Sequence, residues 1–237
     1  MGKTNTHAAG NTRKTVVWVC CALAVLVAAA AVARFVFLPL QTMPGHVYTA
    51  ADFGIEAPAD GHDEDGDGVG DQADILAGAR AYVATRPRYG SAYYQGGRPD
   101  DGRGVCTDVV DQALLAAGYD LRTLVDADRR ANPADYCSDP IDPNIDFRRV
   151  RNVRVFLEHT AESLTCDPER IDQWEGGDIV VWGNHIGVVS DRHDADGVCY
   201  VIHHSSPLQL CYEQDVLRSN RFGPIVGHYR MVGKPGV

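Results

Sequence analysis

The stretch Gly104-Val105-Cys106-Thr107-Asp108-Val109-Val110 opens a segment with the periodicity of a helix. Apolar side chains recur beyond it at the spacing of one helix face, and Gly118 is suited to end the helix. Asp108 falls in the first turn, where an acidic side chain is favoured. Cys106 would begin the helix, where the helix dipole favours a thiolate. The stretch therefore predicts a helix with a reactive thiol at its start; the alternative is a small buried cysteine.

Downstream of this helix, short β-rich runs alternate with turn signals such as Gly183-Asn184 and Asp196-Gly197. Helices come first and hairpin-linked strands follow, which predicts an α+β fold with N-terminal helices packed on an antiparallel sheet. The predicted helices cover 75–85, the Cys106 segment and 153–162, and the predicted strands cover 179–182, 185–190, 199–203 and 227–231. The polar segment 133–152 is predicted to be a loop.

Histidines occur where a base for Cys106 would be needed. His185 begins one predicted strand, and His203 and His204 end the next. A cysteine nucleophile needs a base to take its proton and a third group to orient that base. Pairing of the two strands brings the histidines together, but the register decides whether His203 or His204 shares the face of His185. The alternatives are buried, hydrogen-bonded histidines of the core, or a zinc site with Cys106.

The N-terminal part of the chain predicts export. Thr15 to Ala33 is uncharged, almost wholly apolar and long enough to span a bilayer as a helix. Arg13 and Lys14 precede it, so the positive-inside rule leaves residues 1–14 in the cytoplasm. This predicts a transmembrane anchor over 15–38; the alternative is a signal peptide cleaved near Ala31-Val32-Ala33. Both interpretations place the rest of the chain outside the cytoplasm.

Residues 39–74 are predicted to form a linker that contains an aspartate-rich loop. Segment 63–74 has acids at loop positions one, three, five, nine and twelve and glycine at position six, which is the spacing of a calcium loop. It resembles the calcium loops of thrombospondin type 3 repeats and, more loosely, the EF-hand; the alternative is a solvated acidic linker. Calcium is thus the expected cofactor, and the predicted ligands are Asp63, Asp65, Asp67, the Val69 carbonyl, Asp71 and Asp74.

Charge and cysteine content add two constraints. The chain has a net charge of −10, and its first 38 residues hold bases but no acid, so the remainder is more acidic still. Such a surface argues against a nucleic-acid partner. Five of the seven cysteines lie outside the apolar run, and an odd number leaves one thiol unpaired. The predicted disulfides are Cys137–Cys166 and Cys199–Cys211, with Cys106 left reduced, although other pairings stay open.

The order of these features resembles the NlpC-type, papain-like cysteine peptidases, which cut bacterial cell-wall peptides. The matching residues are Tyr89-Gly90, Cys106, Gly177-Asp178-Ile179-Val180, His185-Ile186-Gly187 and Ile202-His203. The resemblance implies a papain-like fold with Cys106 as nucleophile, His185 as base and His203, rather than His204, as the orienting residue. It also implies that Tyr89 or Tyr93 lies near the oxyanion hole. Thr107 and Asp108 depart from the serine and glycine that usually follow the cysteine in these peptidases.

A closer resemblance, over about Ile75 to Met231, is to the bacterial family known as domain of unknown function 1287. The shared runs are Gly-Val-Cys-Thr-Asp-Val-Val, Asn144-Ile145-Asp146-Phe147-Arg148-Arg149-Val150, Gly-Asp-Ile-Val, His-Ile-Gly-Val-Val-Ser-Asp and the terminal Gly-His-Tyr-Arg. Residues 75–237 are therefore expected to form a papain-like hydrolase domain, anchored in the inner membrane of the bacterial cell envelope, or secreted if the N-terminus is cleaved. The expected activity is hydrolysis of an amide bond in peptidoglycan peptide; the alternatives are a non-catalytic envelope-binding module or the zinc site.

Overall fold

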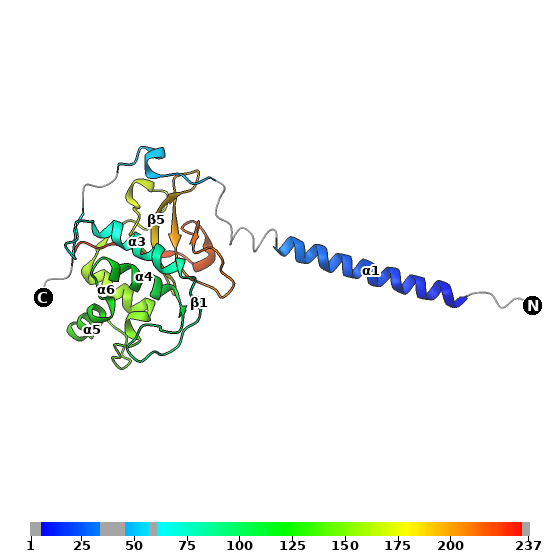
Figure 1. The fold of residues 1–237 in the computed structure, drawn as a ribbon, viewed down its shortest axis with the longest axis horizontal. Helices are drawn as coiled ribbons and strands as arrows, with labels where there is room; N and C mark the ends of the chain where they lie inside the picture. The colour runs from blue at the N-terminus through cyan, green and yellow to red at the C-terminus, as the bar shows by residue number, and fades with distance from the viewer. Residues whose placement is uncertain (1–5, 34–45, 57–60, 234–237) are drawn as a thin grey trace, which may run out of the picture. The chain divides into compact units, whose positions relative to one another are not determined.

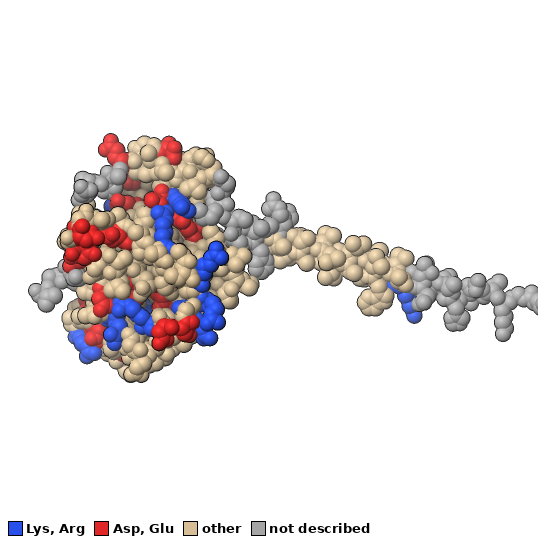
Figure 2. All heavy atoms as spheres, viewed as in Figure 1, with Lys and Arg blue, Asp and Glu red and all other residues tan. Residues whose placement is uncertain are grey.

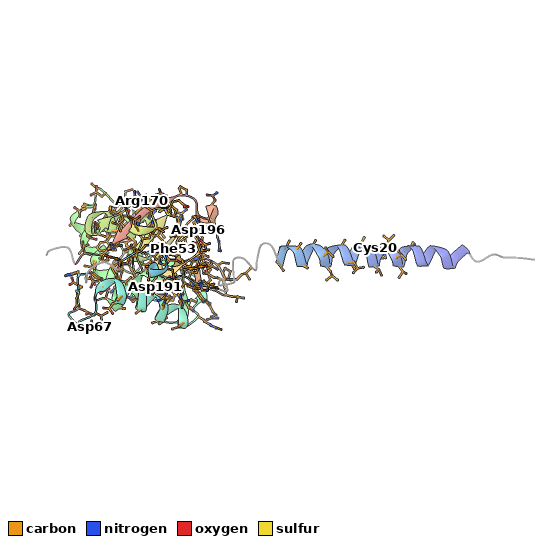
Figure 3. The ribbon with its side chains drawn as sticks, turned by 90° about the horizontal axis from the view of Figure 1, so that it is seen from above. Cys20, Phe53, Asp67, Arg170, Asp191 and Asp196 are labelled. Carbon is orange, nitrogen blue, oxygen red and sulfur yellow. The ribbon has the colours of Figure 1, made fainter. Side chains whose placement is uncertain are left out.

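The computed structural model describes residues 6–33, 46–56 and 61–233 of this 237-residue chain, which form two units, 1–42 and 43–237. The first unit contains α1 (Thr6–Val32), in which Lys14–Val32 is long and apolar enough to cross a membrane by length and composition. Figure 2 shows this helix with almost no charge, and Cys20 projects from it in Figure 3. The last part of the predicted anchor, residues 34–38, lies outside the described residues.

The second unit is built on a six-stranded antiparallel sheet with the strand order β3-β8-β4-β5-β6-β7 (Figure 1). Its strands are β3 (Glu162–Ser163), β4 (Ile179–Trp182), β5 (Ile186–His193), β6 (Cys199–Ile202), β7 (Glu213–Gln214) and β8 (Ile225–Arg230). A separate two-stranded parallel pair, β1 (Arg88–Tyr89) and β2 (Arg103–Gly104), leads into the Cys106 helix. The predicted antiparallel sheet is confirmed: β4 has the predicted ends, and the ends of the other predicted strands differ by at most three residues.

Four helices accompany the sheet in the described part of the second unit: α3 (Asp71–Ala84), α4 (Cys106–Ala116), α5 (Leu121–Ala131) and α6 (Val150–Thr160). Short 3-10 helices lie at η2 (Ala50–Phe53), η3 (Asp146–Arg148), η4 (Ile171–Gln173) and η5 (Asn220–Phe222). Helix α3 packs closely on α4, because a Cβ at Gly78 would lie 2.5 Å from the Cβ of Ala116. Helix α4 in turn packs on β5 (Figure 1), so the start of α4 lies against the central strands.

The two faces of the sheet carry separate apolar clusters, as period-2 alternation requires. Ile179 and Val181 of β4 face the helices, together with Ile186 and Val188 of β5 and the core of α4. The intervening Val180 and Trp182 face the opposite side. There they pack with Trp174 and with the segment that contains Val216 and Leu217. The sheet is therefore buried on both faces, which explains why β4 consists entirely of apolar residues.

The linker predicted over 39–74 is too long. Tyr48 forms an isolated antiparallel bridge with His193 of β5, and Phe53 packs 6.0 Å from the His193 ring. The aspartate-rich loop also belongs to the second unit, because Asp71 begins α3 and the backbone N–H of Asp71 donates to the His62 carbonyl at 2.8 Å. Residues 39–45 and 57–60 lie outside the described part of the chain.

Candidate active site

Cys106 is the first residue of α4, directly after strand β2, and a buried ion pair fixes this junction. Asp108 accepts a hydrogen bond from the Val105 N–H at 2.8 Å and binds Arg148 through both of its oxygens, at 2.7 and 2.9 Å. Thr107 donates to the Arg148 carbonyl at 3.2 Å. Thr107 and Asp108, which depart from the peptidase pattern, therefore connect the Cys106 helix to η3.

Arg148 extends this connection to the loop that precedes Cys106. Its guanidinium donates to the Ala92 carbonyl at 2.8 Å and lies 5.0 Å from the centre of the Tyr94 ring. A buried ion pair keeps its stability only when each charge stays hydrogen-bonded, and Arg148 uses three of its donors here. The loop, η3 and the start of α4 consequently form one rigid support for the thiol.

His185 lies immediately before β5 and is hydrogen-bonded to His203, which follows β6. The distance from His185 Nε2 to His203 Nδ1 is 3.0 Å, and the rings meet edge to face. His203 Nε2 lies 3.1 Å from Oε1 of Gln214 in β7. The side chains thus form a chain of three groups across neighbouring strands. The register of β5 and β6 places His203, and not His204, on the same face as His185, as the peptidase resemblance implies.

The Gln214 amide determines which nitrogens of this chain carry protons. An amide oxygen only accepts, so His203 Nε2 carries the proton and His203 Nδ1 is the acceptor. His185 must then donate from Nε2, which leaves its Nδ1 with a free lone pair. Nδ1 of His185 has no hydrogen-bond partner among the described residues. The arrangement therefore presents an unprotonated nitrogen, the form that a general base requires.

Burial keeps both histidines neutral. His203 is fully buried and His185 is 7% exposed. Desolvation, followed by the charge of Arg221, lowers the pKa of His185 to about 3; desolvation and the neighbouring His185 lower the pKa of His203 well below its ordinary value. Phe222 stacks on the His185 ring at 4.0 Å between centroids and contributes to this burial.

The sulfur of Cys106 lies next to the strand that follows His185. The Ile186 backbone N–H faces the sulfur and favours its thiolate, but burial outweighs it and raises the Cys106 pKa to about 11. Desolvation of the thiol therefore opposes the thiolate that the start of the helix favours. No hydrogen bond joins Cys106 to His185 within the described residues. The resting pair is a neutral thiol and a neutral imidazole.

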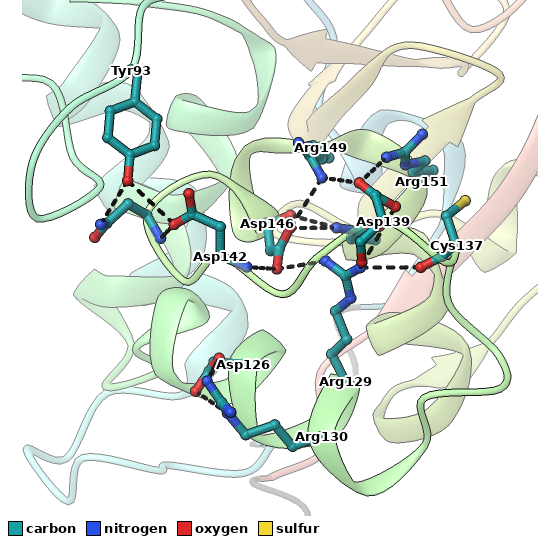
Figure 4. Close-up of polar contacts among 12 residues, drawn as sticks. Tyr93, Asp126, Arg129, Arg130, Cys137, Asp139, Asp142, Asp146, Arg149 and Arg151 are labelled. Atoms are coloured by element: carbon teal, nitrogen blue, oxygen red, sulfur yellow. Dashed lines mark hydrogen bonds and ion pairs between the residues drawn. The ribbon is translucent and has the colours of Figure 1, made fainter.

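The two tyrosines proposed for the oxyanion region lie in different places. Tyr89 packs edge to face against His204 at 5.2 Å, beside the histidine cluster. Tyr93 is 58% exposed and hydrogen-bonds with Asp142 and Asn144 on another loop (Figure 4). His204 is buried between Tyr89 and Tyr212, and its Nδ1 has no hydrogen-bond partner in the part of the chain that the structure describes. Only Tyr89 therefore adjoins the candidate active site.

Three of the predicted calcium ligands converge. Carboxylate oxygens of Asp63, Asp65 and Asp67 lie within 4.8 Å of one another, and Figure 3 labels Asp67 at the edge of the second unit. Burial first, and then these three acids, raise the pKa of Asp74, so Asp74 belongs to the same acidic group. Val69 is exposed at the end of the loop. Asp63 also accepts hydrogen bonds from the N–H groups of Gly66 and Gly68, at 2.8 and 3.0 Å, which fixes the loop turn.

Asp71 has a different role from the one that the loop spacing predicts. It is buried, and its oxygens accept hydrogen bonds from the Glu64 N–H, at 2.8 Å, and from the Tyr119 hydroxyl. Tyr119 follows α4, so Asp71 ties the loop to the far end of the Cys106 helix. Asp71 lies outside the group of converging carboxylates and is a structural anchor.

Neither predicted disulfide is formed, since each of the seven cysteines has a free thiol. Val201 pairs with Gln214 and Ile202 with Glu213, which puts Cys211 opposite His204. Five residues of strand, about 17 Å, then separate Cys211 from Cys199, whereas a disulfide requires Cα atoms within about 7 Å. Cys137 and Cys166 are exposed free thiols. Cys106 is free, as predicted, but so are the other six cysteines, so the odd count does not account for it.

Cys199 contacts a histidine, His193, on the opposite face of the sheet from Cys106. Its sulfur lies 3.6 Å from Nδ1 of His193, and both residues are buried. Burial raises the pKa of the Cys199 thiol to about 12. His193 Nδ1 also lies 2.8 Å from the Gly197 carbonyl, so the pair closes the β5–β6 turn. These properties are those of a structural contact.

The runs Gly-Asp-Ile-Val and Gly-His-Tyr-Arg meet at one buried carboxylate. Asp178 is fully buried and binds Arg230 with two contacts of 2.7 Å and His228 at 3.0 Å. Gln72 of α3 donates to it at 2.7 Å, and the Glu175 N–H donates at 2.9 Å. Asp178 therefore joins α3, β4 and β8, and these two runs support the fold away from Cys106.

A further polar network, drawn in Figure 4, attaches α5 to η3. Arg129 is 2% exposed and lies 2.6 Å from Asp146, and it also donates to the carbonyls of Cys137 and Asp139. Arg149 contacts Asp139 and Asp146 from the other side. This network neutralises the acids of the segment 137–149, which then positions Arg148 beside Asp108.

Gln214 and Phe222 are the candidate-site residues that the sequence did not reveal. Gln214 lies on a two-residue polar strand, and Phe222 lies in a 3-10 helix at the other end of the same segment. Neither has a periodic or motif signal. The sequence offers one indirect signal for Gln214: the chain turns back after His204, and the returning segment is placed to pair with β6.

Comparison with known proteins agrees with the sequence resemblance. The model of the family described as domain of unknown function 1287 matches residues 76–231, more than half of the chain. The uncharacterized protein YijF of Escherichia coli (strain K12) is 38% identical over 170 residues, which cover 66% of this chain and 80% of that protein. No solved structure matches the chain. The chain therefore belongs to the family described as domain of unknown function 1287.

Proposed function

We propose that this protein is a cysteine hydrolase of papain-like, NlpC-type architecture that cleaves an amide bond in peptidoglycan peptide. One observation carries the proposal: the His185–His203–Gln214 chain leaves an unprotonated nitrogen on His185, next to the strand that contacts the Cys106 sulfur. A thiol at a helix start, a neutral base and a group that fixes its tautomer are the components of nucleophilic acyl transfer.

In the proposed reaction, His185 removes the thiol proton of Cys106 as the sulfur attacks the amide carbonyl. The S–C bond forms and the C–N bond then breaks, with His185 returning the proton to the leaving amine. Water attacks the resulting thioester and regenerates the thiol. The Cys106 N–H has no acceptor within its own helix, because it lies in the first turn, and it is the proposed donor to the oxyanion. The high thiol pKa and low imidazole pKa favour proton transfer during attack over a preformed ion pair.

The compartment and substrate follow from the first unit and the resemblance. An apolar helix that precedes the catalytic unit supports placement outside the cytoplasm, either anchored in the inner membrane or released after cleavage. Peptidoglycan peptide is the amide-rich polymer of that compartment, and the NlpC-type peptidases cut it. The cell-wall peptide is therefore the proposed partner and substrate.

A calcium ion in the 63–74 loop is proposed as a structural cofactor. Asp63, Asp65 and Asp67 supply hard oxygen ligands in a flexible loop, which suits calcium. The alternative zinc site is less well supported, because His185 Nε2 and His203 Nδ1 point at each other and share a proton. The His203 Nδ1 lone pair accepts the His185 proton and the other His203 nitrogen donates to Gln214, so His203 has no lone pair left for a zinc ion.

Digestion of purified peptidoglycan by the parent protein and its variants, followed by mass spectrometry, tests the proposal. Cys106→Ala should abolish new peptide products, and adding His185→Ala should cost little more, since the residues act as one unit. His203→Ala should lower the rate less, and His204→Ala should retain it. Intact binding of peptidoglycan without any product would instead favour the envelope-binding module, and chelator-sensitive activity with bound zinc would favour the zinc site.

A further inference from the structure

Arg221 is a cation beside the proposed catalytic histidine with no carboxylate to neutralise it. Its guanidinium carbon lies 5.1 Å from the centre of the Phe222 ring, and that ring stacks on His185 at 4.0 Å. One hydrogen bond, from Nη2 to the Ser205 hydroxyl at 3.0 Å, holds it in place. Among the described residues, no Asp or Glu forms an ion pair with Arg221.

A neighbouring arginine shows that acidic partners occur close to Arg221. Arg218, three residues earlier on the same segment, contacts Asp194, Asp196 and Glu169. The protein is strongly acidic, so a nearby arginine normally finds an acid. Arg221 is exposed to solvent, partial desolvation lowers its pKa, and its charge reaches both His185 and His203. A guanidinium in such a position is suited to bind a carboxylate with two parallel hydrogen bonds.

We propose that Arg221 binds a free carboxylate of the substrate next to the amide bond that Cys106 attacks. The inference rests on the proposed hydrolase function and narrows its substrate to peptides with a carboxylate near the scissile bond. Bound carboxylate would also neutralise the charge that opposes protonation of His185. The base would then accept the Cys106 proton more readily with an anionic substrate in place.

Alkylation of Cys106 by a matched pair of reagents tests this without any knowledge of the natural substrate. Iodoacetate and iodoacetamide both form an S–C bond with release of iodide, but iodoacetate alone carries a carboxylate. Peptide mass spectrometry would follow Cys106 in the full-length protein at pH 8. The quantity compared is the ratio of the iodoacetate rate to the iodoacetamide rate, which Arg221 should raise in the parent. Arg221→Gln should lower this ratio about tenfold, the size expected for the loss of a charge several ångströms away.

Three variants make the result specific. Arg221→Lys should retain part of the ratio because it keeps the charge but loses the fork geometry. Arg170→Gln, which removes an exposed arginine paired with Asp172, should leave the ratio unchanged. The iodoacetamide rate should change less than the iodoacetate rate in each Arg221 variant, which separates a carboxylate-specific effect from a general change at the thiol. An equal fall in the alkylation rate with both reagents, or an unchanged rate ratio in Arg221→Gln, would overturn the inference.

Hydrolysis assays distinguish a failure of the Arg221 proposal from a failure of the proposed hydrolase function. For peptides that differ only as free carboxylate or carboxamide, Arg221→Gln should raise KM for the carboxylate form by a larger factor than for the carboxamide form. Turnover of both forms with no difference between parent and Arg221→Gln would keep the hydrolase and reject the role of Arg221. Absence of both turnover and Cys106 alkylation would reject the two together.

Discussion

At the scale of single residues, the site depends on which nitrogens carry protons. Protonation is determined step by step along the site. The Gln214 oxygen fixes which nitrogen of His203 carries a proton, and His203 in turn fixes the protonated nitrogen of His185, the proposed base for the thiol. The base is kept neutral by burial rather than by a partner carboxylate. Under the proposed mechanism, a change at Gln214 should therefore affect turnover although Gln214 acts on the thiol only through two histidines.

Gln214→Leu should lower kcat because it removes the acceptor that fixes the His203 tautomer. We expect a loss of about ten- to a hundredfold, toward the lower part of the range for a general base. Nitrogen NMR of the His185 ring should show Nδ1 losing its unprotonated signal as tautomers mix. Gln209→Leu, on the same hairpin, is the matched control and should leave the His185 spectrum unchanged. An unaltered spectrum in Gln214→Leu would refute the tautomer argument.

Acid should destabilise the folded protein through its neutral histidines. The folded pKa is about 3 for His185 and about 4 for His204, whereas an unfolded histidine titrates near 6.5. Between these values the unfolded state binds more protons, so the free energy of unfolding decreases as pH falls from about 6.5 toward 4, by up to ~1.4 kcal/mol per pH unit for each histidine.

Urea denaturation at several pH values measures this slope. His204→Phe should make it shallower, because one titrating group is lost while the ring contacts with Tyr89 and Tyr212 remain. A slope that is the same in His204→Phe and the parent would mean that His204 is protonated in the folded state.

At the scale of elements, the position of Cys106 depends on a polar junction between α4, η3 and the preceding loop. The periodicity of the sequence was sufficient to predict helix α4 and the central strands β4 to β6, because their apolar side chains alternate regularly. Helix α5 was missed, since it buries few apolar side chains and is attached through the buried Arg129. Polar long-range contacts such as Arg148–Asp108 leave no local pattern, so they could not be predicted.

Breaking the Arg148–Asp108 pair should destabilise the fold and the site together. Arg148→Met leaves a buried carboxylate without its partner, which costs about 3–5 kcal/mol. Thermal unfolding should show a lower Tm, and turnover should fall because the start of α4 loses its support. Arg130→Met, which removes an exposed i,i+4 pair with Asp126, is the control and should change stability by less than about 1 kcal/mol. Equal stability in the two variants would contradict this account of the junction.

At the scale of the whole molecule, the chain combines an apolar N-terminal helix with an acidic α+β unit. Charge and composition indicated export and an acidic surface, and the motif order identified the three candidate residues. The cysteine pairing failed because parity says nothing about register, which places Cys199 and Cys211 far apart. The aspartate-rich loop was identified by its spacing, but only the structure separates the converging carboxylates from the buried anchor Asp71.

Calcium should stabilise the second unit through the 63–74 loop. The loop lies against the end of α4, where a Cβ at Gly118 would come within 2.9 Å of the Asp65 side chain. At a calcium concentration a hundred times the Kd, linkage adds about 2.7 kcal/mol. The double variant Asp65→Asn, Asp67→Asn should lose this gain but match the parent in chelator, as measured by Tm.

Asp71→Asn provides the contrasting case, because Asp71 binds Tyr119 rather than the converging group. Its Tm should fall in chelator as well as in calcium. A Tm of the parent that is unaffected by millimolar calcium would contradict the calcium proposal, and a fall in Asp71→Asn confined to the calcium condition would assign Asp71 to the ion.

The central claim is that Cys106 forms a covalent acyl intermediate, and intact-protein mass spectrometry after acid quench tests it most directly. Incubation with cell-wall peptides should add the mass of one acyl fragment to the protein, and hydroxylamine should remove it as expected for a thioester. Cys106→Ala should show neither the added mass nor products. Release of products without an adduct on Cys106, at a rate that Cys106→Ala retains, would contradict the account.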